Sequence, residues 1–272
     1  DDYTMDYEYT GIYSAYQYDL RTFVVGDGMK FDFTVALGGV VDNVRDRAVE
    51  VEADDALLSM DLSEFSESEG TPSFTALDGL KGMGRLGALS QSYVSDAFAA
   101  VTEIVPLPSS CYELTGLAGL TILKGRHTAN VTVRATDEIL SDPKAFGPYY
   151  AIGFRIVKAD ADVLVKEKSF EVIAVKCENR FYGNWYHGGR TIVRSDATGE
   201  VLSTDEYELE LPQADSKVYK LTTVDATSVR TDRMGGRTDS LLLTFDGNDI
   251  TIAPADGSDI IINPIQGYPS RF

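Results

Sequence analysis

The chain has 272 residues, of which 43% are hydrophobic and 25% are charged, the balance of an ordinary globular protein with one or two domains. Its 24 Lys and Arg stand against 43 Asp and Glu, which gives a formal net charge of −19. This excess of acid argues against nucleic acid and against electrostatic docking on anionic lipid, because both need a basic surface. No stretch approaches the roughly 18 consecutive apolar residues of a membrane-spanning helix.

The N-terminal part of the chain predicts β-structure. Apolar and polar residues alternate over 31–37, which is typical of a half-buried strand, and this run ends at two glycines. The same alternation returns over 48–52. Residues 54–60 predict one short helical turn that an acidic residue caps.

Residues 61–92 carry Ser, Glu, Gly and Pro with few large apolar side chains, so they predict a long loop insertion. Within it, residues 82–87 match the pattern G-x-G-x-x-G. A dinucleotide site needs an apolar strand immediately before the first glycine, and the residues that precede Gly82 form none. We therefore interpret this match as a glycine-rich loop.

Further strands are predicted at 120–123, 128–134, 149–157 and 170–175, with a short helix at 136–140. An amphipathic helical pattern stands out only near 93–101, which argues against a parallel α/β fold. Strands that are separated by longer loops, without long helices, favour a β-sandwich for this part of the chain.

From about residue 180 the pattern changes to short strands at even spacing, near 181–194, 200–211, 217–224, 227–233, 240–246, 249–253 and 259–263. This spacing predicts a small antiparallel meander, barrel-like or curled. The turn at Asp246-Gly247-Asn248 is a strong hairpin signal. Its oxygen-bearing side chains, with Asp249, offer Ca²⁺ ligands as a less favoured alternative. We place the domain boundary between residues 178 and 179.

Residues that could carry catalysis form no recognisable pattern. The two histidines, His127 and His187, and the two cysteines, Cys111 and Cys177, lack metal-ligand spacing, and both cysteines are predicted to be buried apolar thiols. There is no G-x-S-x-G motif around a serine nucleophile. Single acidic residues along strands are expected on the outward face of antiparallel sheets. The sequence thus predicts no catalytic residue, no metal and no cofactor.

The most distinctive segment is 181–190, which holds the only tryptophan, three other aromatic residues, an amide and three glycines. Aromatic faces stack on sugar rings, and amide and guanidinium groups bond to hydroxyls. The alternative interpretation is core packing where the second sheet begins. The candidate ligand-binding residues are Tyr182, Asn184, Trp185, Tyr186, His187 and Arg190.

Several short segments together carry a resemblance to a known family. They are Ala36-Leu37-Gly38-Gly39-Val40, Leu107-Pro108 before Tyr112-Glu113-Leu114, Ile122-Leu123-Lys124-Gly125 and Ser169–Val175. The chain resembles Bacteroidetes surface lipoproteins of the polysaccharide-utilisation type, which have an N-terminal Ig-like domain of unknown function. Phe181 to Gly189 is similar to the Gly-Asn-Tyr signature that opens the second domain, with Trp185 in place of the tyrosine.

The resemblance implies a fold and a role. It implies an all-β chain, with an Ig-like β-sandwich over 1–178 and a smaller barrel-like (lipocalin-like) antiparallel meander over 179–272. It also implies a non-catalytic cell-surface protein that binds or presents glycans for uptake, beside outer-membrane glycan-import proteins. A lipid anchor would hold it to the outer membrane, or facing the periplasm; the anchoring cysteine is not in this sequence, so a trimmed form is expected. The alternative is a structural or adhesive module that binds a partner protein.

Overall fold

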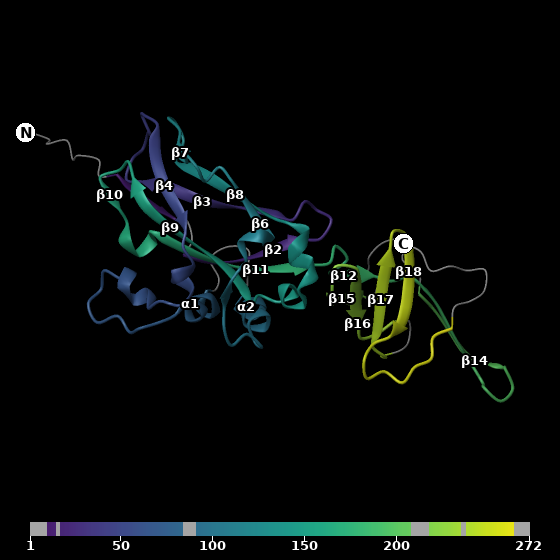
Figure 1. Cartoon of the computed structure of the whole chain (residues 1–272). Coiled ribbons are helices and arrows are strands. Elements are labelled where there is room, and N and C mark those ends of the chain that lie inside the picture. The colour runs from purple at the N-terminus through teal and green to yellow at the C-terminus, as the bar shows by residue number, and fades with distance from the viewer. Residues whose placement is uncertain (1–9, 15–16, 84–90, 208–217, 235–237, 264–272) are drawn as a thin grey trace, which may run out of the picture. The chain divides into compact units, whose positions relative to one another are not determined.

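The computed structural model describes residues 10–14, 17–83, 91–207, 218–234 and 238–263 (Figure 1). The chain divides into two compact units, Asp1–Cys177 and Glu178–Phe272. Both are mostly β-structure, as the sequence predicts, and each is described by itself. In the described residues no helix is long and apolar enough to cross a membrane.

The first sheet of the first unit has five strands in the order β10-β1-β3-β8-β6. These strands are β10 (Val163–Leu164), β1 (Gly11–Ser14), β3 (Lys30–Gly38), β8 (Thr128–Ala135) and β6 (Tyr112–Thr115). β1 runs parallel to β10, and the other pairs are antiparallel. The alternation predicted over 31–37 is confirmed in β3, where Phe33, Val35 and Leu37 are buried.

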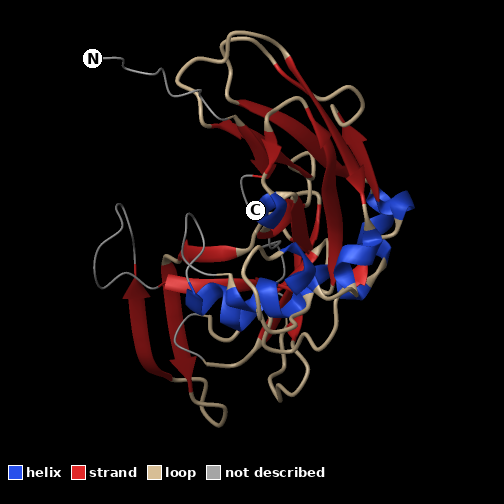
Figure 2. Ribbon diagram, turned by 90° about the vertical axis from the view of Figure 1, so that its left-hand side faces the viewer, coloured by secondary structure: helices blue, strands red, loops and turns tan. Residues whose placement is uncertain are grey.

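The second sheet has the order β2-β11-β9-β4-β7. It consists of β2 (Tyr18–Val24), β11 (Phe170–Glu178), β9 (Tyr150–Ala159), β4 (Arg47–Ala53) and β7 (Thr121–Ile122), and β5 (Val105–Pro106) adds to β9 in parallel. The first unit therefore has two sheets that mix parallel and antiparallel pairs, in the part of the chain for which the sequence predicts a β-sandwich. Figure 2 shows their long strands curling beside a group of short helices.

The second sheet is covered on both faces, which explains its nearly continuous apolar strands. Along β11, Ile173, Val175 and Cys177 belong to one core cluster together with Phe33 of the first sheet. The alternate residues, Phe170, Val172 and Ala174, belong to a second cluster that short helices complete. These helices are η1 (Asp55–Leu58), η2 (Leu62–Phe65), α1 (Ala76–Gly82) and α2 (Gln91–Ala97).

The prediction of a long loop over 61–92 is wrong for the described residues. Leu62, Ala76 and Leu80 are fully buried or nearly so and pack against the second sheet. Local caps define the helix ends: Asp61 accepts a bond from Ser63 N, and Thr75 forms a capping box with Asp78. A few apolar side chains at helical spacing are enough to hold these short helices in place, because the second sheet supplies the rest of the core. Of the G-x-G-x-x-G match, residues 84–87 lie outside the described part.

Other predicted elements of the first unit agree with the structure. Asp54 caps η1, and the helix expected at 136–140 appears as η4 (Asp137–Ser141), followed by η5 (Pro143–Phe146). Two more single turns are η3 (Ser109–Cys111) and η6 (Lys166–Lys168). Both cysteines are free and buried, which confirms their interpretation as apolar thiols.

The second unit contains an antiparallel five-stranded sheet in the order β12-β15-β16-β17-β18. Its strands are β12 (Gly183–Tyr186), β15 (Val218–Thr223), β16 (Ser228–Thr231), β17 (Leu241–Asp246) and β18 (Asp249–Pro254). Phe181, Val229, Leu241 and Leu243 form its small core. The predicted hairpin at 246–249 is confirmed, with Asp246 opposite Asp249 and a positive φ at Gly247. A separate hairpin, β13 (Gly189–Arg194) with β14 (Val201–Tyr207), projects from this sheet (Figure 1).

Three details of the predicted meander are wrong. The described strands pair in a linear order from β12 to β18, and no described pairing closes them into a lipocalin-like barrel. The run 181–194 is two strands, because the chain leaves β12 at His187-Gly188. Residues 259–263 form no strand; Ile260 and Ile262 instead pack as irregular chain against the core. At Ile260 and Ile262, the alternation of apolar side chains therefore indicates burial and not strand pairing.

Candidate functional site

The predicted aromatic site centres on Trp185 in β12. Its indole N–H donates a hydrogen bond of 2.8 Å to the carbonyl oxygen of Phe181. The Phe181 ring is buried and stacks on Phe245 with 3.9 Å between centroids. Trp185 is therefore anchored to the core through its nitrogen edge, while 38% of its surface stays exposed. An indole held in this way presents an apolar face at little conformational cost.

β12 divides the candidate residues between its two faces, as strand alternation requires. Trp185 lies opposite Tyr219 of β15, which is buried and whose ring centroid is 4.9 Å from that of His187. Tyr186 and Asn184 point to the other face, where both are exposed, Tyr186 at 57%. Tyr182 is half-buried just before the strand. The candidate residues therefore do not share one surface.

Arg190 lies in a different sheet from Asn184, Trp185 and Tyr186. It belongs to β13, opposite Glu206 of β14, and its Nη1 is 3.8 Å from Glu206 Oε1. Both side chains are exposed, so this ion pair contributes little to stability. The same hairpin carries four exposed apolar side chains, which are Ile192, Val193, Val201 and Leu202.

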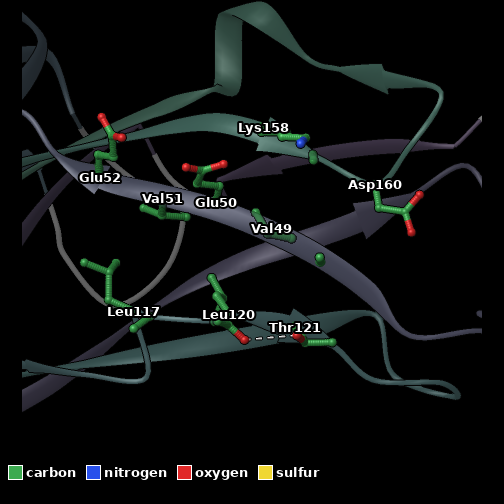
Figure 3. A pocket seen from close by; sticks show the side chains of 13 residues that line it. Val49, Glu50, Val51, Glu52, Leu117, Leu120, Thr121, Lys158 and Asp160 are labelled. Atoms are coloured by element: carbon green, nitrogen blue, oxygen red, sulfur yellow. Dashed lines mark hydrogen bonds between the residues drawn. The ribbon is translucent and has the colours of Figure 1, made fainter.

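A hollow that the sequence analysis did not predict lies in the first unit. It is a groove of about 810 Å³ beside β4 (Figure 3). Its lining residues come from β4, from the segment that leads into β7, and from the end of β9: Ala48, Val49, Glu50, Val51, Glu52, Leu117, Ala118, Gly119, Leu120, Thr121, Lys158, Ala159 and Asp160. Figure 3 shows Glu50 and Glu52 projecting on the side of Lys158, with Leu117 and Leu120 across the opening.

The groove exists because β7 is much shorter than β4. β4 pairs with β9 along its length, but β7 pairs only with Arg47 and Ala48. The last contact on this side of β4 is a hydrogen bond of 2.9 Å that Val49 N donates to Leu120 O, just before β7. Beyond it, no described strand pairs with β4 on this side. The alternation that predicted this strand was visible in the sequence, whereas its free edge depends on the length of β7.

Glu171 in β11 contradicts the expectation that acids along strands face outward. It is 2% exposed and accepts a hydrogen bond of 2.6 Å from the Ser14 hydroxyl. Burial raises the pKa of Glu171 to about 8, against the lowering effect of the Ser14 bond. The expectation fails because both faces of this sheet are covered. The cavity beside Glu171 has a volume of only about 10 Å³ and is lined mainly by core residues, so it has no room for a ligand.

Metal-binding clusters are absent from the described part of the chain, where no three His, Cys, Asp or Glu residues gather. The Asp246 and Asp249 pair forms the ends of a tight hairpin turn. This geometry supports the turn interpretation of that segment over the Ca²⁺ alternative.

Comparisons with known proteins support the fold. No family and no curated protein matches the sequence. A Bacteroides ovatus protein of unknown function is similar in structure, with a TM-score of 0.60 at 19% identity over 92% of this chain and 78% of the other. This likeness shows that the chain shares its fold with a Bacteroides protein, as the resemblance led us to expect.

Two further solved structures match with lower scores. One is a multidomain protein including DUF1735 from Bacteroides ovatus, with a TM-score of 0.42, 9% identity, and 92% and 72% coverage. The other is an auxiliary nutrient binding protein from Bacteroides thetaiotaomicron, with a TM-score of 0.39, 13% identity, and 88% and 70% coverage.

Proposed function

We propose that this chain is a non-catalytic binding protein of the bacterial cell surface, which takes glycan at the aromatic edge of β12. The single observation that carries this proposal is the anchored yet exposed Trp185, with the exposed Tyr186 beside it. β12 is the edge strand of its sheet, so a flexible glycan chain can reach both of its faces. Asn184 adds an amide that can bond to hydroxyl groups on the Tyr186 face.

The setting of this function comes from the sequence resemblance. We infer a lipid anchor to the outer membrane and glycan-import proteins as neighbours. In the same way we assign residues 1–178 to an Ig-like sandwich domain and 179–272 to a small β-domain. Expression of residues 1–178 alone tests the division: a single cooperative unfolding transition supports it, and an unfolded or aggregated fragment contradicts it.

The first test uses Trp185 as the reporter, because the chain holds one tryptophan. Acrylamide quenching of its fluorescence is measured with and without a panel of host and plant polysaccharides. We expect strong quenching that a bound polysaccharide reduces. No protection by any member, together with no heat in calorimetric titration, would contradict glycan binding at β12.

Two variants separate stacking from general apolar contact. Tyr186→Ala removes an exposed ring, and Val218→Ala shortens the exposed side chain directly opposite it in β15. We expect Tyr186→Ala to weaken binding about tenfold, a loss of about 1.4 kcal/mol, and Val218→Ala to change it little. Equal losses in both variants would contradict a stacking site.

A second candidate function is that of a structural or adhesive module, which the exposed apolar residues of the β13–β14 hairpin favour. Such side chains gathered on a projecting hairpin are typical of contact surfaces. Sedimentation velocity tests self-association through this hairpin, with Leu202→Asp as the disrupting variant and Thr204→Asp as its control. If the protein sediments as a monomer at every concentration, self-association through this hairpin is not its function.

A further inference from the structure

We propose that the groove beside β4 is a docking site for an extended polypeptide in which apolar residues alternate with Lys or Arg. The segment would add to the second sheet as a strand along the free edge of β4. This inference concerns the first unit and goes beyond the glycan site proposed on β12.

The backbone of β4 offers the hydrogen-bonding groups. Ala48 O accepts from Asp160 N, and Asp54 N donates to Gly153 O, so even-numbered residues direct their backbone groups toward β9. Val49 N donates to Leu120 O, so odd-numbered residues direct theirs to the other side. Val51, which lines the groove, and Ala53 just beyond its lining therefore present N–H and C=O groups on this side, where no described strand pairs with them. Edge groups of this kind are a template for another strand.

The side chains of β4 define what the added strand must carry. Val49 and Val51 are 4% and 7% exposed and face the core side, where Leu117 and Leu120 line the groove opposite them. Residues of the added strand on that face must be apolar, because a polar group there would lose its hydration.

Glu50 and Glu52 are exposed on the other face of β4 and supply the charge preference. Their cross-strand neighbours on the β9 side are the cations Lys158 and Arg155. On the groove side, no Lys or Arg lies among the lining residues 117–121. Opposite charges directly across a pair of strands are favourable and like charges are not. A strand with Lys or Arg at these positions therefore fits, and an acidic strand is rejected.

The groove is large enough for this occupant. A strand lies about 4.8 Å from its neighbour and advances about 3.3 Å per residue, so about four residues of the added strand would follow β4 beyond Val49. The groove has a volume of about 810 Å³, and its lining along β4 runs from Ala48 and Val49, where the contact with β7 ends, to Glu50–Glu52 in the open stretch.

The test uses three dye-labelled probe peptides of about six residues and fluorescence anisotropy at physiological salt. The first alternates Lys and Val, the second alternates Glu and Val, and the third is the Lys-Val peptide with N-methyl groups on alternate backbone nitrogens. We expect the first peptide to bind at least about tenfold more tightly than the other two, a difference of about 1.4 kcal/mol or more. N-methylation is decisive because it keeps the charge and removes the donors of strand pairing.

Matched variants locate the binding. The double variant Glu50→Lys with Glu52→Lys is expected to weaken Lys-Val binding at least about tenfold and to strengthen Glu-Val binding. Glu69→Lys makes the charge change of one of these two substitutions at another exposed acid of this unit and is expected to have little effect. Ala53→Pro removes one edge donor at an exposed position, and circular dichroism verifies that each variant folds.

Three outcomes would overturn the proposal. The Lys-Val peptide fails to bind, or its N-methylated form binds equally well, which indicates non-specific attraction to an acidic chain. In the third outcome, Glu69→Lys weakens binding as much as the double variant does. None of these measurements involves Trp185 or a polysaccharide, so a failure here leaves the glycan proposal standing on its own test.

Discussion

The hydroxyl of Ser14, in β1, donates a hydrogen bond of 2.6 Å to Oε2 of Glu171, in β11, and so joins the two sheets of the first unit through their shared core. Ser14 is 3% exposed and Glu171 is 2% exposed. Burial is the main reason that the pKa of Glu171 rises to about 8; the Ser14 bond lowers it, Asp19 raises it and Arg21 lowers it. A neutral carboxyl group in the core follows from this arrangement at neutral pH.

The stability of the first unit should therefore depend on pH through Glu171. Its folded pKa of about 8 lies above the ordinary value of 4.5 for a glutamate, so the folded state holds a proton that the unfolded state loses. This contribution to stability is complete below the unfolded pKa and is lost as pH rises through the folded pKa. We expect the free energy of unfolding, from urea titrations, to fall by up to about 1.4 kcal/mol per pH unit between the unfolded pKa of 4.5 and the folded pKa of about 8.

Glu171→Gln is the control, because the amide has a similar shape and does not titrate. We expect this variant to lack that part of the pH dependence and to be more stable than the wild type at about pH 9. Identical pH profiles for both proteins would show that Glu171 is ionised in the folded state.

Gly153 should not tolerate a side chain. A Cβ at this position would lie 2.4 Å from the carbonyl oxygen of Asp54 and 3.2 Å from Leu57 Cβ, where η1 crosses β9. We expect Gly153→Ala to destabilise the protein by about 1–3 kcal/mol, measured by urea unfolding. Gly82→Ala is the control, since nothing lies within 4 Å and alanine favours the helix. A stable Gly153→Ala variant would mean that η1 shifts freely from the sheet.

Asn43 organises the loop between β3 and β4. It is 2% exposed; its amide donates bonds of 3.0 Å to Leu123 O and Arg126 O, and its Oδ1 accepts one of 3.0 Å from Arg47 Nε. Asn43→Ala leaves the buried Arg47 and the two loop carbonyl groups without these bonds, and we expect a loss of about 2–4 kcal/mol in thermal or urea unfolding.

Val44→Ala provides the comparison for the Asn43 variant. Val44 belongs to the same loop and is 68% exposed, so its truncation should change stability by less than about 0.5 kcal/mol. Similar losses for the two variants would assign the effect to the loop backbone rather than to the Asn43 amide.

The two thiols should resist alkylation while the protein is folded. Cys111 is 8% exposed and Cys177 is fully buried; burial is the main cause that raises the pKa of Cys177 to about 12, and the nearby Cys111 adds to it. Because the thiolate is the reactive form, we expect almost no reaction with iodoacetamide at neutral pH, and complete labelling in guanidinium. Peptide mass spectrometry measures both, and rapid native labelling of Cys177 would contradict its burial.

Individual strands could be predicted from the sequence because their side chains repeat with the period of a pleated strand. Phe33, Val35 and Leu37 show this in β3, and the turn at Gly247 identified its hairpin through backbone geometry alone. The exposed position of Tyr186 and the partial exposure of Trp185 were not readable from sequence. The alternation within a strand shows which residues share a face. The neighbouring elements determine which of the two faces is exposed to solvent.

Local chemistry thus determined the mostly β character of the chain and its turns and caps. Tertiary structure alone decided that the short helices η2 and α1 pack against the second sheet, that Glu171 is buried, and that β4 has a free edge among the described strands. These features depend on contacts between residues far apart in the chain, such as Ser14 with Glu171 and Val49 with Leu120. No local pattern encodes them, because a short segment has the same periodicity whether its neighbour is a strand, a helix or water.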